Sequence, residues 1–157
     1  MAGTAARPRC YVASALGFTE AGAHYYEHVY LPALSAVVTP VDPWALTTAQ
    51  EVAEARAARR ERDFALEIGA RNAQAIRTCT LLAAHLEGQE VDSGTAAEVG
   101  FAAALGMRCF GLRTDLRESG ERGVSVNLQV EHFLVASGGS LCTSLGQLVE
   151  ELAVAAR

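Results

Sequence analysis

The sequence places two carboxylates, Asp92 and Glu98, six residues apart at the start of an Ala-rich and almost uncharged stretch. Residues 95–105 are predicted to form a helix that ends before Gly106, and their apolar composition predicts burial. The start of such a helix carries the positive end of the helix dipole, which favours an ionised carboxylate. We therefore expect two carboxyl groups with different roles in acid–base or nucleophilic chemistry, with Glu98 held ionised by the helix end.

The same spacing also fits a purely structural role. Thr95 and Glu98 form a capping-box pattern, in which Thr95 accepts a hydrogen bond from the third helical amide and Glu98 accepts one from the Thr95 amide. Spacing alone therefore leaves two interpretations open, a helix cap and a reactive pair.

The whole string from residue 92 to residue 106, DSGTAAEVGFAAALG, resembles the signature of the nucleoside 2-deoxyribosyltransferase family, Asp-x-Gly-Thr-Ala-x-Glu-x-Gly-x-Ala. Further similar segments lie at 84–88, 111–117 and 126–130. The resemblance covers most of the chain, from about Cys10 to Ala153.

This resemblance implies an enzyme that moves 2-deoxyribose from one nucleobase to another without a cofactor. Breaking an N-glycosidic bond generates positive charge at the anomeric carbon and leaves a base that needs a proton. We assign Glu98 as the nucleophile that holds the deoxyribosyl group as a covalent ester, and Asp92 as the group that hydrogen-bonds the base and handles its proton. A second base then attacks the ester, giving a ping-pong reaction with retention of configuration.

Further ligand-binding residues are expected where the first predicted strand ends, because ligands of open parallel sheets bind at the carboxyl ends of strands. This region supplies the candidates Tyr11, Ser14, Ala15 and Phe18, and the helix start supplies Ser93 and Gly94. For Phe18 ordinary core packing is the alternative, whereas the family resemblance places an aromatic ring here against the nucleobase.

Two amides are assigned to substrate orientation. Asn72 matches a family position where an Asn or Asp reaches towards the ligand, and Asn127 matches an Asn that a neighbouring subunit contributes. The resemblance therefore implies a homodimer or an assembly of dimers. Two positions depart from the family pattern, since Ser14 stands where Gly is common and His85 where Asn or Asp is common.

The pattern of apolar segments predicts a single α/β domain over residues 1–157, with a flavodoxin- or Rossmann-like parallel sheet of about five strands and helices on both faces. Strands are expected at 9–15, 36–41, 78–86, 107–112 and 131–136, and helices at 19–34, 45–62, 64–77, 95–105 and 143–156. The first helix carries an aromatic face, Tyr25, Tyr26 and Tyr30, that predicts core or subunit-interface packing.

Composition narrows the classes of ligand. A formal charge of −5 and a pI near 5.3 argue against nucleic acid as a partner, because a phosphate backbone requires a basic face. The glycines form neither a dinucleotide-binding nor a triphosphate-binding motif. Deoxyribonucleosides and free nucleobases, small and weakly charged, fit this composition better.

The cysteines and histidines do not indicate a metal site. The four cysteines are scattered and predict buried, reduced thiols, and His24 and His28 lack a third ligand. The start of the chain has no stretch of signal-peptide length, and no later stretch approaches a membrane span, so we expect a cytoplasmic protein.

Two alternative functions remain open at this level. The first is a nucleoside or 2'-deoxynucleoside 5'-monophosphate N-glycosidase, with Ser14, Ser93 and Arg113 around the phosphate. The second is a non-catalytic nucleoside-binding protein in which Glu98 only caps its helix. No single residue distinguishes transfer to a second base from hydrolysis by water.

Overall fold

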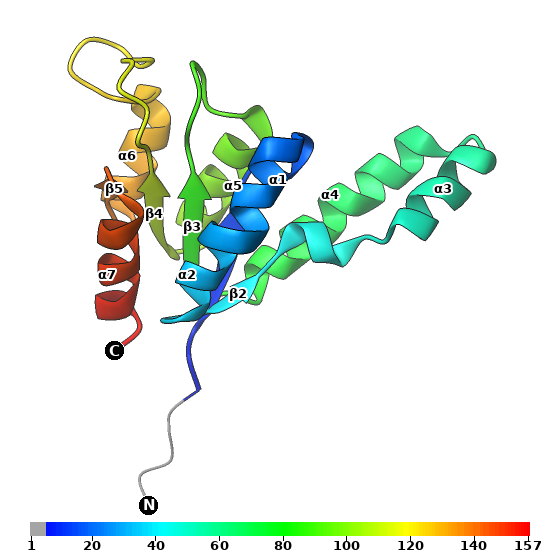
Figure 1. Cartoon of the computed structure of the whole chain (residues 1–157), viewed down its shortest axis with the longest axis horizontal. Helices are drawn as coiled ribbons and strands as arrows, with labels where there is room; N and C mark the ends of the chain where they lie inside the picture. The colour runs from blue at the N-terminus through cyan, green and yellow to red at the C-terminus, as the bar shows by residue number, and fades with distance from the viewer. Residues whose placement is uncertain (1–5) are drawn as a thin grey trace, which may run out of the picture.

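In the computed structural model, which describes residues 6–157, five parallel strands form one sheet in the order β2-β1-β3-β4-β5 (Figure 1). The strands are β1 (Arg9–Ala13), β2 (Thr39–Val41), β3 (Leu81–His85), β4 (Arg108–Leu112) and β5 (Leu141–Cys142). The predicted α/β class and the five-stranded parallel sheet are confirmed.

Helices cover both faces of this sheet. They are α1 (Glu20–Tyr25), α2 (Leu31–Ser35), α3 (Ala49–Ala57), α4 (Glu61–Arg77), α5 (Ser93–Ala104), α6 (Leu128–Ala136) and α7 (Leu145–Ala155), with a 3₁₀ turn η1 (Leu16–Phe18), a π-helical turn η2 (Tyr26–Tyr30) and a 3₁₀ turn η3 (Pro43–Leu46). Because side chains alternate along a strand, Tyr11 of β1 enters a hydrophobic cluster with residues of α5 and α6. Its neighbours Cys10 and Val12 enter a second cluster, with residues of η2, α2 and α7.

The aromatic face of the first helix belongs to this second cluster. Helices α1 and α2 form one nearly continuous segment through η2, and Tyr26 and Tyr30 are buried against the sheet. Tyr25 is partly buried beside them. Core packing and subunit-interface packing were the two roles predicted for this face, and within one chain these tyrosines pack in the core.

The predicted strand at 131–136 is wrong, because these residues belong to α6. Val130 and Leu134, one helical turn apart, are both buried in the core, and the Asn127 side chain caps the helix by accepting a hydrogen bond of 2.9 Å from the Gln129 amide. The apolar run was too short for its period to distinguish a strand from a helix. The fifth strand is instead the two-residue β5.

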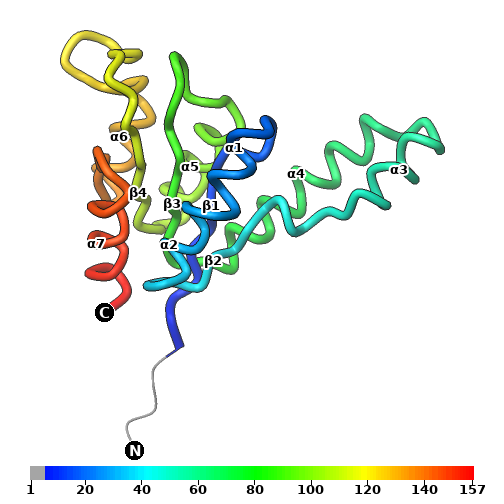
Figure 2. The backbone as a smooth tube through the Cα atoms, viewed as in Figure 1, coloured from blue at the N-terminus to red at the C-terminus, as the bar shows by residue number. Residues whose placement is uncertain are grey.

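Helices α3 and α4 form a hairpin that projects from the side of the sheet, as the ribbon of Figure 1 and the trace of Figure 2 both show. The helix expected at 45–62 begins only at Ala49, because η3 precedes it and Thr48 caps it in a capping box with Glu51. Arg59, with a φ of 54°, turns the chain between the two helices.

All four cysteines lie within the described residues and are buried and unpaired, as predicted. Burial raises the pKa of the Cys109 thiol to about 11, so this thiol is protonated at neutral pH. Within residues 6–157, no helix has both the length and the apolar character needed to cross a bilayer.

Candidate active site

Glu98 lies in the second turn of α5, where the helix packs on the sheet. Its Oε1 accepts a hydrogen bond of 2.6 Å from the Tyr11 hydroxyl, which reaches it from β1. Tyr11 is fully buried, and burial together with the neighbouring Glu98 carboxylate raises the pKa of its phenol far above the ordinary range. Tyr11 therefore acts as a protonated donor to Glu98.

The pKa of Glu98 is raised above its ordinary value, chiefly because burial disfavours the charged carboxylate. Hydrogen bonding from Tyr11 and Asn72 lowers this pKa, and the nearby charge of Asp92 raises it. The prediction that the helix end holds Glu98 ionised is wrong, because α5 begins at Ser93 and the dipole acts mainly within the first turn. The main support of the ionised form is the Tyr11 hydroxyl.

Asp92, rather than Thr95, is the N-cap of α5. Its Oδ2 accepts hydrogen bonds from the Thr95 amide at 2.8 Å and from the Thr95 hydroxyl at 3.1 Å. The capping box of Thr95 and Glu98 is therefore wrong, and Glu98 is not occupied with the helix start. Asp92 Oδ1 has no hydrogen-bond partner among residues 6–157.

A cavity of about 380 Å³ lies beside the two carboxylates. Apart from Asn72, Asp92 and Glu98, much of its surface is apolar and comes from η3, α3 and α4. The lining residues are Ser14, Phe18, Pro43, Trp44, Thr47, Val52, Ile68, Asn72, Asp92, Gly94, Thr95 and Glu98. No cationic side chain of the described part of the chain belongs to this lining.

Phe18 and Trp44 form an aromatic pair at this cavity, with ring centroids 4.8 Å apart in an edge-to-face arrangement. Core packing of Phe18 is wrong, since 74% of the residue is exposed. Gly17 permits the pair, because a β-carbon at this position would lie 2.5 Å from the Trp44 ring. The loop after β1 and the turn after β2 thus meet at one aromatic contact.

Four residues predicted to bind the ligand are not part of this lining. Tyr11 is fully buried and reaches the site only through Glu98, and Ala15 does not line the cavity. Ser93 is exposed at the start of α5 and is not part of the lining. Asn127 is exposed as the cap of α6 and lines a separate hollow of about 270 Å³ with Glu90 and Val91. Within one chain Asn127 therefore does not meet Glu98, and its contribution across a subunit interface stays a prediction.

His85 also lies elsewhere, on the opposite face of the sheet from α5. Its ring contacts Tyr25 and Tyr30, at centroid distances of 6.1 and 5.5 Å, and burial lowers its pKa. The pair His24 and His28 stack on each other, and no group of three His, Cys, Asp or Glu side chains in residues 6–157 is arranged to hold a metal ion.

Sequence reasoning missed the apolar part of the lining. Trp44 lies in the turn η3 that follows the carboxyl end of β2, and β2 is next to β1 in the sheet. Because ligands bind at the carboxyl ends of parallel strands, this place was a signal for Trp44. Val52 and Ile68 gave no such signal, because they look like ordinary apolar positions of two amphipathic helices. Only the hairpin geometry brings them to Asn72.

Comparisons with known proteins identify the fold and the family. The structure of a conserved protein from Enterococcus faecalis V583 aligns with a TM-score of 0.68 and 20% identity, covering 96% of this chain and 99% of that one. A 2-desoxiribosyltransferase from Leishmania mexicana aligns with a TM-score of 0.66 and 24% identity, covering 94% and 97%. A CMP N-glycosidase from Clostridium botulinum aligns with a TM-score of 0.51 and 17% identity, covering 94% and 98%.

At these identities the structural neighbours show the shared fold. The sequence has no significant match among curated proteins. The family model described as nucleoside 2-deoxyribosyltransferase, however, matches residues 10–137, which is most of the chain. The protein belongs to the nucleoside 2-deoxyribosyltransferase family.

Proposed function

We propose that this protein is a nucleoside 2-deoxyribosyltransferase with Glu98 as its nucleophile and Asp92 as the group that handles the proton of the base. The observation that carries the proposal is the hydrogen bond from Tyr11 to Glu98 at a cavity that Asp92 also lines. A carboxylate that only capped its helix would accept from amides of the first turn. Glu98 instead lies in the second turn of α5 and accepts from the phenol of Tyr11.

In the first half-reaction a Glu98 oxygen bonds to the anomeric carbon while the bond from that carbon to the base nitrogen breaks. The electron pair of the broken bond passes to the base, which takes up one proton relayed by Asp92 from water. In the second half-reaction another base attacks the anomeric carbon and gives up its proton by the same route. The ester bond breaks as the new bond to the base nitrogen forms, and the Glu98 carboxylate is restored.

The apolar lining supports transfer between bases. Phe18 and Trp44 offer aromatic surface to a planar nucleobase, and Val52 and Ile68 extend the apolar contact. A site that holds a base by flat apolar contact favours a second base over water in the second half-reaction. Asn72 lies beside Glu98 and is assigned to orientation of the substrate.

The electrostatics of the lining favour unphosphorylated nucleosides over 5'-monophosphates. Two carboxylates line the cavity, and no cation of the described residues does. Arg113, one residue that a phosphate site would use, is buried and donates to backbone carbonyls instead. Ser14 accepts a hydrogen bond from the Leu16 amide, and Ser93 lies outside the lining. A phosphate dianion would therefore meet like charge without compensation.

The proposal includes a homodimer, or an assembly of dimers, in which Asn127 completes the site of the partner. Its support is that Asn127 is exposed at the start of α6 and does not line the cavity of its own chain. Mixing inactive Glu98→Ala chains with inactive Asn127→Ala chains should restore part of the activity. A monomer in sedimentation that is fully active at the same concentration would contradict the shared site.

Product analysis tests the reaction. The protein should convert 2'-deoxyinosine and adenine into 2'-deoxyadenosine and hypoxanthine, and should release hypoxanthine slowly when adenine is absent. Fast release that adenine does not divert would indicate an N-glycosidase, and no reaction at all would indicate a binding protein. 2'-Deoxyinosine 5'-monophosphate is the matched control for the phosphate argument and should react poorly.

A 2'-deoxy-2'-fluoroarabinosyl purine tests the covalent step. Fluorine next to the anomeric carbon slows both formation and breakdown of the ester, so an adduct should accumulate and map to Glu98 by mass spectrometry. Free purine should discharge the adduct faster than water does. Turnover of the normal substrate without any adduct would contradict the nucleophile, and an adduct on Asp92 would reverse the two roles.

A further inference from the structure

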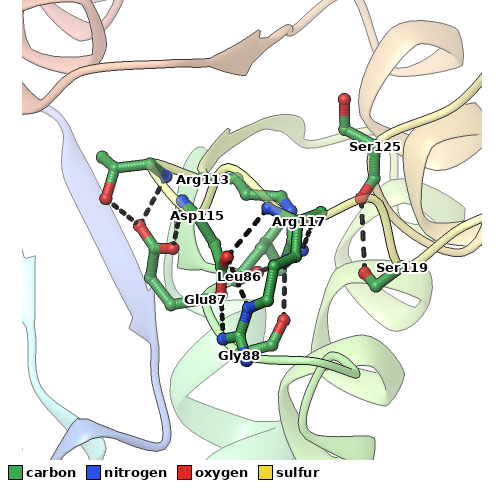
Figure 3. Close-up of polar contacts among 9 residues, drawn as sticks. Leu86, Glu87, Gly88, Arg113, Asp115, Arg117, Ser119 and Ser125 are labelled. Atoms are coloured by element: carbon green, nitrogen blue, oxygen red, sulfur yellow. Dashed lines mark hydrogen bonds and ion pairs between the residues drawn. The ribbon is translucent and has the colours of Figure 1, made fainter.

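Arg113, the first residue after β4, is a buried cation, with 3% of its surface exposed. No carboxylate within residues 6–157 forms an ion pair with it. Its guanidinium instead donates to three backbone oxygens, to Leu86 at 2.8 Å and Gly88 at 3.0 Å through Nη1 and to Arg117 at 2.7 Å through Nη2 (Figure 3). Burying a charge without a direct ion pair is costly, and these charge-assisted bonds offset part of that cost.

Glu87 makes the reverse connection. Its carboxylate accepts from the Thr114 amide, from the Thr114 hydroxyl at 2.7 Å and from the Asp115 amide at 2.8 Å (Figure 3). Glu87, in the segment after β3, thus binds the backbone of the segment after β4. Arg113, at the start of the segment after β4, binds the backbone of the segment after β3. We call these two residues the clamp.

The clamp holds the segment that enters the site. Residues 88–91 lie in neither helix nor strand and lead directly to Asp92. Within the described chain, the bond from Arg113 to the Gly88 oxygen is the one hydrogen bond that residues 88–91 make. Among the described residues, the Asp92 carboxylate bonds only to Thr95, and its backbone oxygen accepts from the Ala96 amide, so both contacts lie on its own helix. Val91 packs against the hydrophobic core, and Arg113 supplies the hydrogen bond that holds the path of the chain into Asp92.

We propose that Arg113, supported by Glu87, is a positioning residue that fixes the connection between β3 and α5 and thereby the Asp92 carboxylate against the leaving base. This inference rests on the proposed function, because it gives Asp92 the proton-handling role. Lysine cannot replace this arginine, since one ammonium group cannot span three carbonyl oxygens in the geometry of a planar fork.

The test is a double-mutant cycle on base release from 2'-deoxyadenosine. Arg113→Lys should lower kcat by about 10- to 100-fold, with KM within about 3-fold, as expected for a loss of alignment. In an Asp92→Asn background the same substitution should cost less than about 3-fold, because the residue through which it acts is already disabled. Glu87→Gln should show the same dependence on Asp92 at a smaller amplitude, and it keeps the test open if Arg113→Lys does not fold.

Arg108→Lys is the matched control. Arg108 lies at the other end of β4 and also donates to a backbone oxygen, that of Gly138, but it is remote from Asp92. This variant should keep kcat within about 2-fold, whatever its melting temperature. Additive losses from Arg113→Lys and Asp92→Asn would overturn the positioning role while leaving the proposed function intact. A wild-type protein that releases no base would overturn the proposed function, and the inference with it.

Discussion

Two walls of the cavity differ in how the fold supports them. The polar wall consists of Asn72, Asp92 and Glu98, with Tyr11 behind it, and the apolar wall consists of Pro43, Trp44, Val52 and Ile68. Asp92 and Glu98 lie where α5 packs on the sheet core, beside the buried Tyr11 and Thr95, and Asn72 joins them from α4. The apolar wall belongs to η3 and to the projecting hairpin (Figure 1). Trp44 and Val52 remain 37% and 45% exposed.

This difference separates two tasks. A nucleophile and a proton-handling group must be held within a fraction of an ångström, which a buried strand and a packed helix provide. A planar base needs only apolar area of the right shape, which a lightly packed hairpin can supply. We therefore expect substitutions in the polar wall to lower kcat and substitutions in the apolar wall to raise KM.

The largest effect should come from Glu98→Gln in the polar wall. Without the carboxylate no ester forms, and base exchange should fall on the order of 10⁴-fold or more. Product chromatography under saturating deoxynucleoside measures this loss. Retention of a tenth of the wild-type rate would mean that Glu98 has a structural role. The expected difference in kcat between substitutions in the two walls would then be wrong.

The same variant should gain stability at neutral pH. Because the pKa of Glu98 is raised in the folded state, folding is favoured while Glu98 is protonated, and this contribution is lost as pH rises through the folded-state pKa. Gln keeps an oxygen that can accept from Tyr11 and removes the buried charge. Urea unfolding should show a higher free energy of unfolding for Glu98→Gln at neutral pH and no such gain in acid.

Tyr11→Phe should give the second largest effect. It removes the hydrogen bond that favours the ionised carboxylate, so the pKa of Glu98 rises further. The acid limb of the kcat profile should move to higher pH, and kcat at neutral pH should fall about 10- to 100-fold. An unchanged acid limb would show that another group controls it.

The polar wall could largely be predicted from the sequence. Asp92, Gly94 and Glu98 lie in one contiguous string, and the carboxyl end of a buried strand drew attention to Tyr11. The support of Glu98 was misjudged, because the sequence does not show that α5 starts at Ser93 and leaves Glu98 in the second turn. The strand at 131–136 failed for a related reason, since short apolar runs fit either period.

The apolar wall could not be predicted to the same degree. Val52 and Ile68 reach the cavity only because α3 and α4 fold back on each other at Arg59. The periodicity of apolar residues predicts each helix but not the turn between the two helices. The partners of Arg113 could not be predicted either, because they are backbone oxygens, which every residue has. The single-domain organisation predicted over 1–157 stays a prediction.

Trp44→Ala sharpens the comparison from the apolar side. Loss of the indole removes the partner of Phe18 and much of the flat surface offered to the base, so KM for 2'-deoxyadenosine should rise about 10-fold. The kcat value should stay within about 3-fold, because Tyr11 and Glu98 are untouched. A fall in kcat comparable to that of Tyr11→Phe would mean that the walls do not act separately.

The smallest effect should come from Gly17→Ala, which reaches the apolar wall without removing any group from it. The added methyl carbon would lie 2.5 Å from the Trp44 ring, so the indole must shift. We expect KM to rise about 3-fold and kcat to stay unchanged, a weaker copy of Trp44→Ala. In a Trp44→Ala background the added methyl group has no ring to displace, so Gly17→Ala should then leave KM as it is. An equal rise in KM in both backgrounds would place the effect on the loop after β1 itself, rather than on the aromatic pair.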